Sequence, residues 1–254
     1  MSSGFVKFAP DPRFHIGVRD LHVWHAELTN VEGAKALQPL LSPDESERAA
    51  RFRFPEHQRR FVIARGFLRQ LLAAYLGIEA RDVTFTYSEN AKPELSELHR
   101  GDIFFNASHS GDLAAFAFAV GRKVGVDVEC IRHDVDVDEI PRRFFSPHEQ
   151  QALAALEDGK KIEGFFNCWT RKEAYVKAVG SGLSLPLRDF DVSLSPGEPT
   201  QLIATRPADM ASKWTMESLE LGQGYAAAVV VEGPIEKLLV RHFTSGVLSA
   251  QRST

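Results

Sequence analysis

The chain has 254 residues, of which 44% are hydrophobic and 25% are charged, and its formal net charge at pH 7 is −4. This average globular composition excludes a disordered, collagen-like or coiled-coil chain, and the slightly acidic balance argues against a general nucleic-acid binder. Two cysteines, Cys130 and Cys168, are too few for a disulfide framework and lack the spacing of metal ligands. We therefore expect reduced thiols in a cytoplasmic protein without a signal peptide or a membrane-spanning segment.

The first half of the chain begins with a predicted strand at 21–25. A helix is predicted to start at Ser42, which has Glu45 three residues later in the pattern of a capping box. A longer helix follows at about 55–76 and ends at a glycine. The apolar run at 113–120 is too short to span a membrane and predicts a buried strand.

The second half repeats this order of elements. It has a predicted strand at 124–129, a capped helix start at Ser146, a longer helix at about 163–179 and an apolar strand at 225–231. Ser146 lies 104 residues after Ser42, and we assign the same offset to the two first strands.

Several features that keep one offset indicate an internal duplication. We predict an α+β, sandwich-like fold of two half-domains related by pseudo-twofold symmetry, residues 1–121 and 122–254. Clefts between such halves are common ligand sites, so we expect the functional site there, within a monomer. The alternative is a chance match, because serine–proline helix starts are common and the identity between the halves is low.

Acidic side chains alternate with valines in the predicted strand at 124–129. Asp127 and Glu129 therefore share one face of the strand, where their charges repel each other. Mg²⁺ would offset this repulsion, because it prefers oxygen ligands and is usually held by carboxylates together with substrate phosphates. The alternative is a strand with one solvated acidic face.

A second set of side chains lies on the predicted long helix of the second half. Trp169, Glu173 and Lys177 follow one another at intervals of four residues and share one helix face. Glu173 could add a third carboxylate to the metal or remove a proton, and Lys177 could contact a phosphate. An ordinary Glu–Lys helix pair is the alternative.

A polar segment, Ser108-His109-Ser110, precedes the apolar strand at 113–120. Hydroxyls, an imidazole and backbone N–H groups at a strand edge are potential phosphate donors. Structural turn chemistry is the alternative. Lys92 lies upstream. Basic side chains on the helices of the first half, which we expect to be mostly solvated, are Arg48, Arg60, Arg65 and Arg69.

Four stretches, taken in order, resemble the 4′-phosphopantetheinyl transferases of the long, surfactin-synthetase-activating type. They are Ala91-Lys92-Pro93, residues 105–110 (Phe-Asn-Ala-Ser-His-Ser), residues 125–129 (Gly-Val-Asp-Val-Glu) and residues 169–177, which include Lys172-Glu173-Ala174. The last two stretches together are specific to the family. Two positions depart from it: Ala91 replaces the usual glycine, and Glu45 stands where some members have a lysine.

The resemblance implies the activity. Enzymes of this family transfer the phosphopantetheine arm of coenzyme A to a serine of an acyl- or peptidyl-carrier protein and release adenosine 3′,5′-bisphosphate. The resemblance implies that Asp127, Glu129 and Glu173 hold Mg²⁺ on the pyrophosphate. Glu173 would also take the proton of the carrier serine, directly or through water, and Lys177 would contact the phosphate that is attacked.

The resemblance also implies which residues bind the coenzyme A phosphates. Lys92, Ser108 and His109 would contact them, together with Lys177. Arg48 and Arg60 would lie near the 3′-phosphate and the adenine.

The carrier-docking surface is less visible in the sequence. Phe144-Phe145 and Phe165-Phe166 could form an apolar docking surface, although such pairs more often belong to a core. Two other functions stay open: a magnesium-dependent coenzyme A pyrophosphatase, which needs no carrier, and a non-catalytic carrier-binding protein. The chain lacks the carboxylate-rich helix usual in the former, and it retains the metal ligands whose loss the latter predicts.

Overall fold

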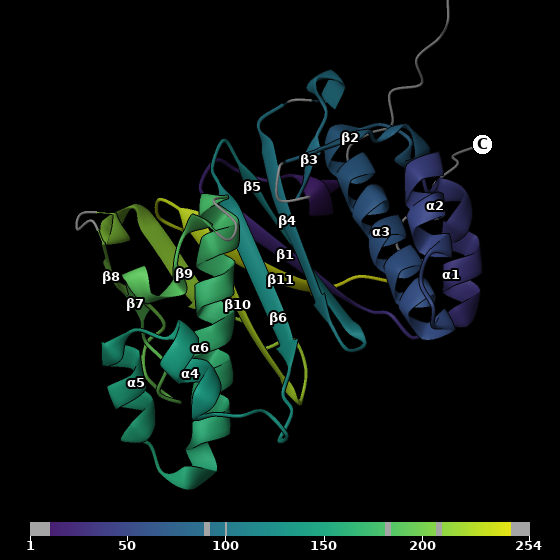
Figure 1. The fold of residues 1–254 in the computed structure, drawn as a ribbon. Coiled ribbons are helices and arrows are strands. Elements are labelled where there is room, and N and C mark those ends of the chain that lie inside the picture. The colour runs from purple at the N-terminus through teal and green to yellow at the C-terminus, as the bar shows by residue number, and fades with distance from the viewer. Residues whose placement is uncertain (1–10, 89–91, 100, 181–183, 207–209, 245–254) are drawn as a thin grey trace, which may run out of the picture. The chain divides into compact units, whose positions relative to one another are not determined.

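The structure, a computed structural model, describes residues 11–88, 92–99, 101–180, 184–206 and 210–244. The described part of the chain forms two compact units (Figure 1). The helical unit contains residues 11–17 and 29–101 with Thr244, and the sheet unit contains residues 18–28 and 102–243. Ala91 of the first motif and residues 181–183 lie outside the described residues.

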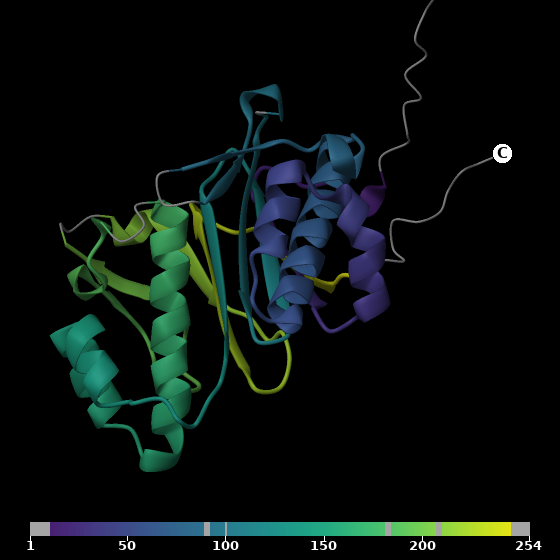
Figure 2. The same cartoon turned by 45° about the vertical axis from the view of Figure 1, so that its right-hand side comes forward.

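Three helices make up most of the helical unit, and Figure 2 shows them side by side. They are α1 (Val31–Leu37), α2 (Pro43–Ala50) and α3 (Pro55–Leu76), and the hairpin of β2 (Phe85–Tyr87) and β3 (Pro93–Leu95) follows. The predictions for α2 and α3 are confirmed. A capping box starts α2, and α3 ends at Gly77, whose φ of 67° suits a residue without a Cβ atom.

The sheet unit contains two main sheets, with the strand orders β11-β1-β5-β4 and β6-β10-β9. Their bounds are β1 Asp20–Glu27, β4 Ile103–Ser110, β5 Leu113–Val120, β6 Val124–Cys130, β9 Trp214–Ser218, β10 Tyr225–Glu232 and β11 Lys237–His242. Neighbouring strands are antiparallel except for β1 and β11. A hairpin pairs β7 (Phe190–Val192) with β8 (Leu202–Thr205). The two apolar runs predicted as strands are β5 and β10, as expected.

The helices of the sheet unit are α4 (Glu139–Phe144), α5 (Pro147–Ala154) and α6 (Asp158–Val179). The predicted capping box starts α5. Helix α6 begins at Asp158 rather than at Glu163, because Asp158 is favourable at a helix N-terminus and also pairs with Lys161. No helix within the described ranges is long and apolar enough to cross a bilayer.

The order of elements repeats along the chain, as predicted. Each repeat supplies a strand, a capped short helix, a long helix, a small hairpin and two further strands, and the order β1-β5-β4 corresponds to β6-β10-β9. The mixed α+β class is therefore confirmed. The compact units are not the two repeats, because β1, β4 and β5 of the first repeat pack within the sheet unit. The boundary at residue 121 stays a prediction.

The predicted offset of 104 residues is right for the short helices and wrong for the strands. Helices α2 and α5 begin 104 residues apart, whereas α3 and α6 begin 103 residues apart. In the strands, the buried face determines which residues of the two repeats correspond. Val23 lies in the same core as Val126, which is 103 residues later. A slip of one residue moves every side chain to the other face of a strand. Asp127 therefore corresponds to Trp24.

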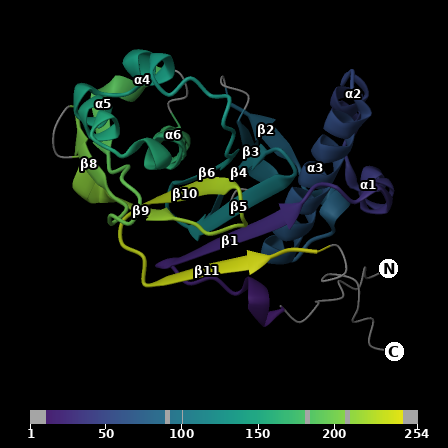
Figure 3. The ribbon, with the colours of Figure 1, turned by 90° about the horizontal axis from the view of Figure 1, so that it is seen from below.

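Two apolar cores divide the sheet unit into layers, which Figure 3 shows with α6 seen end-on. The core between the two sheets is formed by alternate residues of β1, β5, β6 and β10, among them Val126 and Val229. The second core joins the outer face of β10 to α6 and includes Phe165, Tyr175 and Ala228. Helix α6 thus covers the outer face of the sheet β6-β10-β9.

A buried ion pair between the short and the long helix occurs in both repeats. Glu45 on α2 lies 2.7 Å from Nε of Arg69 and 3.5 Å from Nε of Arg65. Glu149 on α5 lies 2.7 Å from Nζ of Lys172 on α6. The expectation that Arg65 and Arg69 are solvated is wrong, because both are buried beside a carboxylate that needs a cation there.

Candidate active site

Helix α6 packs against β6 at a glycine. A Cβ atom at Gly125 would lie 2.1 Å from the carbonyl oxygen of Ala174 and 2.3 Å from the backbone nitrogen of Ala178, so only glycine permits this approach. Gly125 shares its face of β6 with Asp127 and Glu129. The packing of α6 on β6 therefore brings the two acidic side chains towards the helix.

Asp127 is a buried carboxylate that contacts both β4 and α6. Its Oδ1 atom accepts hydrogen bonds from Ser108 Oγ at 2.9 Å and from Lys177 Nζ at 2.6 Å, and Lys177 Nζ lies 2.9 Å from Ser108 Oγ. Only 3% of Asp127 is exposed. The structure brings these three predicted residues together. The alternatives of a solvated acidic face on β6 and of a turn at Ser108 are both wrong.

The second carboxylate oxygen of Asp127 differs from the first. Oδ2 is buried and has no hydrogen-bond partner among the residues that the structure describes. Burial raises the pKa of Asp127, although the Lys177 charge and the hydrogen bonds from Lys177 and Ser108 act in the opposite direction. A buried carboxylate oxygen is normally satisfied by a donor or a cation. Oδ2 is therefore a candidate ligand atom.

Glu129 and Glu173 extend the acidic site. Glu129 Oε2 accepts a hydrogen bond from Ser110 Oγ at 2.7 Å. Burial raises the pKa of both glutamates, and the charge of Asp127 raises both further. The charge of Glu129 also raises the pKa of Glu173. These mutual effects show that the three carboxylates lie within electrostatic range of one another.

The donor set of the three carboxylates suits a hard divalent cation. Asp127, Glu129 and Glu173 offer only oxygen atoms, which Mg²⁺ prefers, and the single charge of Lys177 does not balance all three. Within the described ranges, no three acidic, histidine or cysteine side chains are close enough to hold a metal ion by themselves. A Mg²⁺ ion at this site would thus take further ligands from water or a substrate, as it usually does.

The other residues predicted to bind coenzyme A are His109, Lys92, Arg48 and Arg60. His109 is exposed on the face of β4 opposite to that of Ser108. Lys92 precedes β3, Arg48 lies exposed on α2, and Arg60 lies on α3, so all three belong to the helical unit. Their contacts with phosphates stay predictions.

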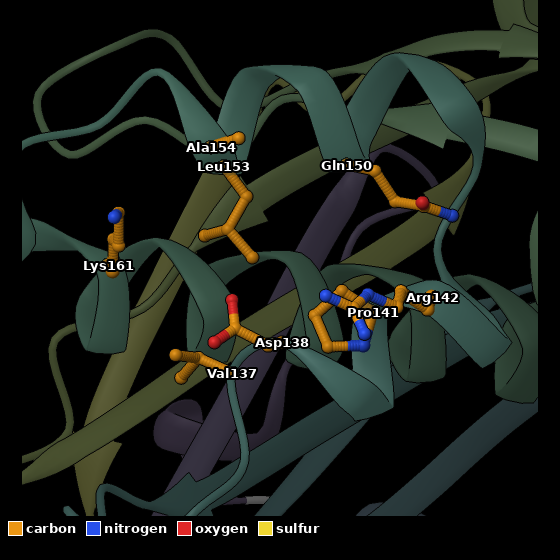
Figure 4. A pocket seen from close by; sticks show the side chains of 8 residues that line it. All are labelled: Val137, Asp138, Pro141, Arg142, Gln150, Leu153, Ala154 and Lys161. Carbon is orange, nitrogen blue, oxygen red and sulfur yellow. The ribbon is translucent and has the colours of Figure 1, made fainter.

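A cavity of about 260 Å³ lies among α4, α5 and the N-terminal end of α6 (Figure 4). It is lined by Val137, Asp138, Pro141, Arg142, Gln150, Leu153, Ala154 and Lys161. None of these is a predicted site residue, and Glu173 and Lys177 lie near the opposite end of α6. The phenylalanines considered as a docking surface are mostly core, since Phe145, Phe165 and Phe166 are buried.

Sequence reasoning named Gly125 and Ser110 but missed their roles at the acidic site. Gly125 admits α6, and Ser110 donates a hydrogen bond to Glu129. The two-residue period of a strand could have indicated both roles. It puts Gly125 on the same face as Asp127, and Ser110 on the same face as Ser108.

Comparison with known proteins matches both halves of the chain to models of 4′-phosphopantetheinyl transferases. Residues 24–120 match the family model described as "4′-phosphopantetheinyl transferase, N-terminal", and residues 123–230 match the model of the 4′-phosphopantetheinyl transferase superfamily. The 4′-phosphopantetheinyl transferase HetI of Nostoc sp. is 40% identical over 216 residues, which cover 84% of this chain and 88% of HetI.

Two further relatives are more distant. The 4′-phosphopantetheinyl transferase Sfp of Bacillus subtilis is 31% identical over 194 residues, which cover 76% of this chain and 83% of Sfp. Among solved structures, the holo-(acyl-carrier-protein) synthase from Bacillus anthracis, in complex with CoA (3′,5′-ADP), matches at 20% identity with a TM-score of 0.34. The match covers 44% of this chain and 96% of that chain.

The molecule is thus an α+β protein with a duplicated order of elements and an acidic, oxygen-rich site in its second repeat. It belongs to the 4′-phosphopantetheinyl transferase family, in its two-domain, Sfp-like form. It is an enzyme that transfers 4′-phosphopantetheine to carrier proteins. The predicted activity is confirmed, and the alternatives of a pyrophosphatase and of a non-catalytic binder are wrong.

Proposed function

We propose that the acidic site holds one Mg²⁺ ion on the diphosphate of coenzyme A during this transfer. The observation that carries the proposal is Asp127, whose Oδ1 is fixed by Ser108 and Lys177 while its Oδ2 is buried without a partner in the described structure. Glu129 and Glu173 supply the further protein oxygens. When bound, the ion would neutralise charge on the diphosphate and make its phosphorus a better electrophile.

In the reaction, the hydroxyl oxygen of the carrier serine forms a bond to the phosphorus that bears pantetheine. The bond from this phosphorus to adenosine 3′,5′-bisphosphate breaks. Glu173 takes the serine proton, directly or through water, as the family resemblance implies. Lys177, whose side chain is partly exposed, donates to an oxygen of the phosphate under attack.

The remaining contacts of coenzyme A follow from the family resemblance. We propose that Lys92, Ser108 and His109 bind its phosphates, and that Arg48 and Arg60 lie near the 3′-phosphate and adenine.

The domain organisation and location are also proposals. The two family models meet between residues 120 and 123, which supports half-domains of 1–121 and 122–254. We also propose that the enzyme is a monomer. The free thiols Cys130 and Cys168 suit a reducing compartment, so we propose a cytoplasmic enzyme.

The variant Asp127→Asn tests the metal site. It keeps the size of the side chain and removes the charge, so carrier modification, followed by mass spectrometry, should fall by more than about 100-fold, since even residues that only support a metal ligand cost 10–100-fold. Glu217→Gln is the matched control, because Glu217 is an exposed acid on β9. Retention of most of the kcat/KM of the unaltered enzyme at saturating Mg²⁺, in a variant with an unchanged melting temperature, would contradict the proposal.

The variant Glu173→Gln tests the base. Loss of a general base should lower kcat by about 10²–10⁴-fold, with a much smaller change in affinity for coenzyme A. Turnover assays beside isothermal titration with coenzyme A separate the two quantities. The assignment of the base is wrong if affinity falls while kcat is retained.

A further inference from the structure

Strands β4 and β6 belong to different sheets, and side chains join them. Asn106, Ser108 and Ser110 lie on one face of β4 at intervals of two residues. Asn106 Oδ1 accepts a hydrogen bond from a backbone N–H of β6 at 2.9 Å, and the two serines donate to Asp127 and Glu129. The two serines thus restrain the acidic side chains of β6, whereas Asn106 holds only the backbone of β6.

The hydroxyl of Ser110 has a defined direction. The backbone N–H of Cys130 donates to Ser110 Oγ at 3.1 Å, and Ser110 Oγ donates to Glu129 Oε2 at 2.7 Å. Because a hydroxyl has one proton, this arrangement commits it to Glu129. Hydrogen bonds to an ionised carboxylate are stronger than those between neutral groups. Ser110 therefore restrains one oxygen of Glu129 and leaves Oε1 for another ligand.

We propose that Ser110 is a positioning residue, which orients Glu129 for ligation of the metal ion. The proposal rests on the magnesium site proposed above. The carboxylate that Ser110 contacts is Glu129, whereas Asp127 has its own hydrogen bonds from Ser108 and Lys177. Supporting hydrogen bonds of this kind typically change metal affinity by about 10–100-fold. The polar motif on β4 accordingly serves the metal ligands as well as the predicted phosphate contacts.

The test compares Ser110→Ala with Ser110→Thr in the full chain. Binding of Mn²⁺ alone, a paramagnetic substitute for Mg²⁺, is measured by electron paramagnetic resonance. Ser110→Ala should weaken Mn²⁺ binding by about 10–100-fold, and the Mg²⁺ concentration needed for half-maximal transfer should rise with it. Ser110→Thr keeps the hydroxyl and should restore Mn²⁺ affinity. Equal Mn²⁺ affinity in Ser110→Ala and the unaltered enzyme would overturn the proposal.

Two further variants separate positioning from other effects. Asn106→Ala removes a hydrogen bond between β4 and β6 that reaches no carboxylate. It should lower the melting temperature and leave Mn²⁺ affinity unchanged, and an equal loss of Mn²⁺ affinity would overturn the positioning role. If both Ser110→Ala and Asp127→Asn retain Mn²⁺ binding, the proposed magnesium site itself is wrong. If Asp127→Asn loses Mn²⁺ and Ser110→Ala retains it, only the role of Ser110 is wrong.

Discussion

The two repeats share a scaffold but differ in chemistry. Where β6 has Asp127 and Glu129, β1 has Trp24 and Ala26 at the equivalent positions. Trp24 is buried and packs edge-on against the ring of Phe243. The strand positions that carry carboxylates in the second repeat therefore make apolar contacts in the first repeat.

The long helices differ in the same way. Glu173 and Lys177 of α6 correspond to Gln70 and Ala74 of α3, so the first repeat lacks both the acid and the cation. The features that both repeats keep are structural: a capping box, a left-handed glycine after the long helix, and a buried ion pair between the two helices. Each repeat has to satisfy its own helix ends and buried charges, which explains why these features occur twice.

The largest effect is expected where α6 meets β6. Gly125→Ala would place a Cβ atom 2.1 Å from a backbone oxygen of α6, and a backbone contact cannot be relieved by a side-chain rotation. We expect a loss of more than about 5 kcal/mol, which is comparable with the whole stability of a typical domain. Urea unfolding or the yield of folded protein measures it.

The matched control is Gly159→Ala, in the first turn of α6. An added Cβ atom at Gly159 meets nothing within 4 Å, so this variant should be as stable as the unaltered protein or more stable by about 0.4–1 kcal/mol. A stable Gly125→Ala variant would mean that α6 can move away from β6 without loss of the fold.

The next largest loss of stability is expected at the two buried ion pairs. Lys172→Met leaves Glu149 buried without its cation, which typically costs about 3–5 kcal/mol. Arg69→Met should cost less, because Arg65 remains 3.5 Å from Glu45. Urea unfolding of both variants gives the difference. Equal losses would show that Arg65 does not compensate Glu45.

A smaller difference is expected at the two capping serines. The Oγ of Ser146 is fully buried and accepts a hydrogen bond from the backbone N–H of Glu149. Ser42 is only half-buried, so water can replace its hydroxyl. Ser146→Ala should cost about 2 kcal/mol and Ser42→Ala about 0.5–1 kcal/mol. Thermal unfolding of the two variants checks which serine contributes more to stability. A larger loss of stability in Ser42→Ala would contradict the expected order.

The sequence predicts local structure well where a residue type occurs at a position for a single physical reason. Serine with glutamate three residues later locates the starts of α2 and α5, and a glycine locates the end of α3. The alternation of Asp127 and Glu129 with valines predicts their common face. These signals depend only on hydrogen bonds and periodicities within one segment, so no knowledge of packing is needed.

Contacts between segments are harder to predict. Nothing local to Arg69 or Lys172 indicates that each is buried beside a glutamate from another helix. Lys177 likewise bonds to Asp127 on a distant strand, a contact that nothing local to Lys177 indicates. The one-residue error in the strand offset has the same origin, because only the core shows which face of β1 is buried.

The smallest expected effect concerns an ion pair that only the second repeat has. Asp191 on β7 accepts a hydrogen bond from Arg206 at 2.8 Å, whereas the equivalent central residue of β2 is the exposed Thr86. Burial alone would raise the pKa of Asp191, but hydrogen bonds from Ser146 and Arg206 and the Arg206 charge leave it below its ordinary value.

A carboxylate with a lowered pKa stabilises the fold above its unfolded pKa, and this contribution is lost as the pH falls through the lowered value. Arg206→Met should therefore cost less than about 1 kcal/mol near neutral pH, since Arg206 is half exposed. The difference from the unaltered protein should shrink as the pH falls below about 4, and in high salt. Urea unfolding across this pH range measures it. A difference that persists unchanged in acid would show that Arg206 stabilises β7 and β8 by packing rather than by charge.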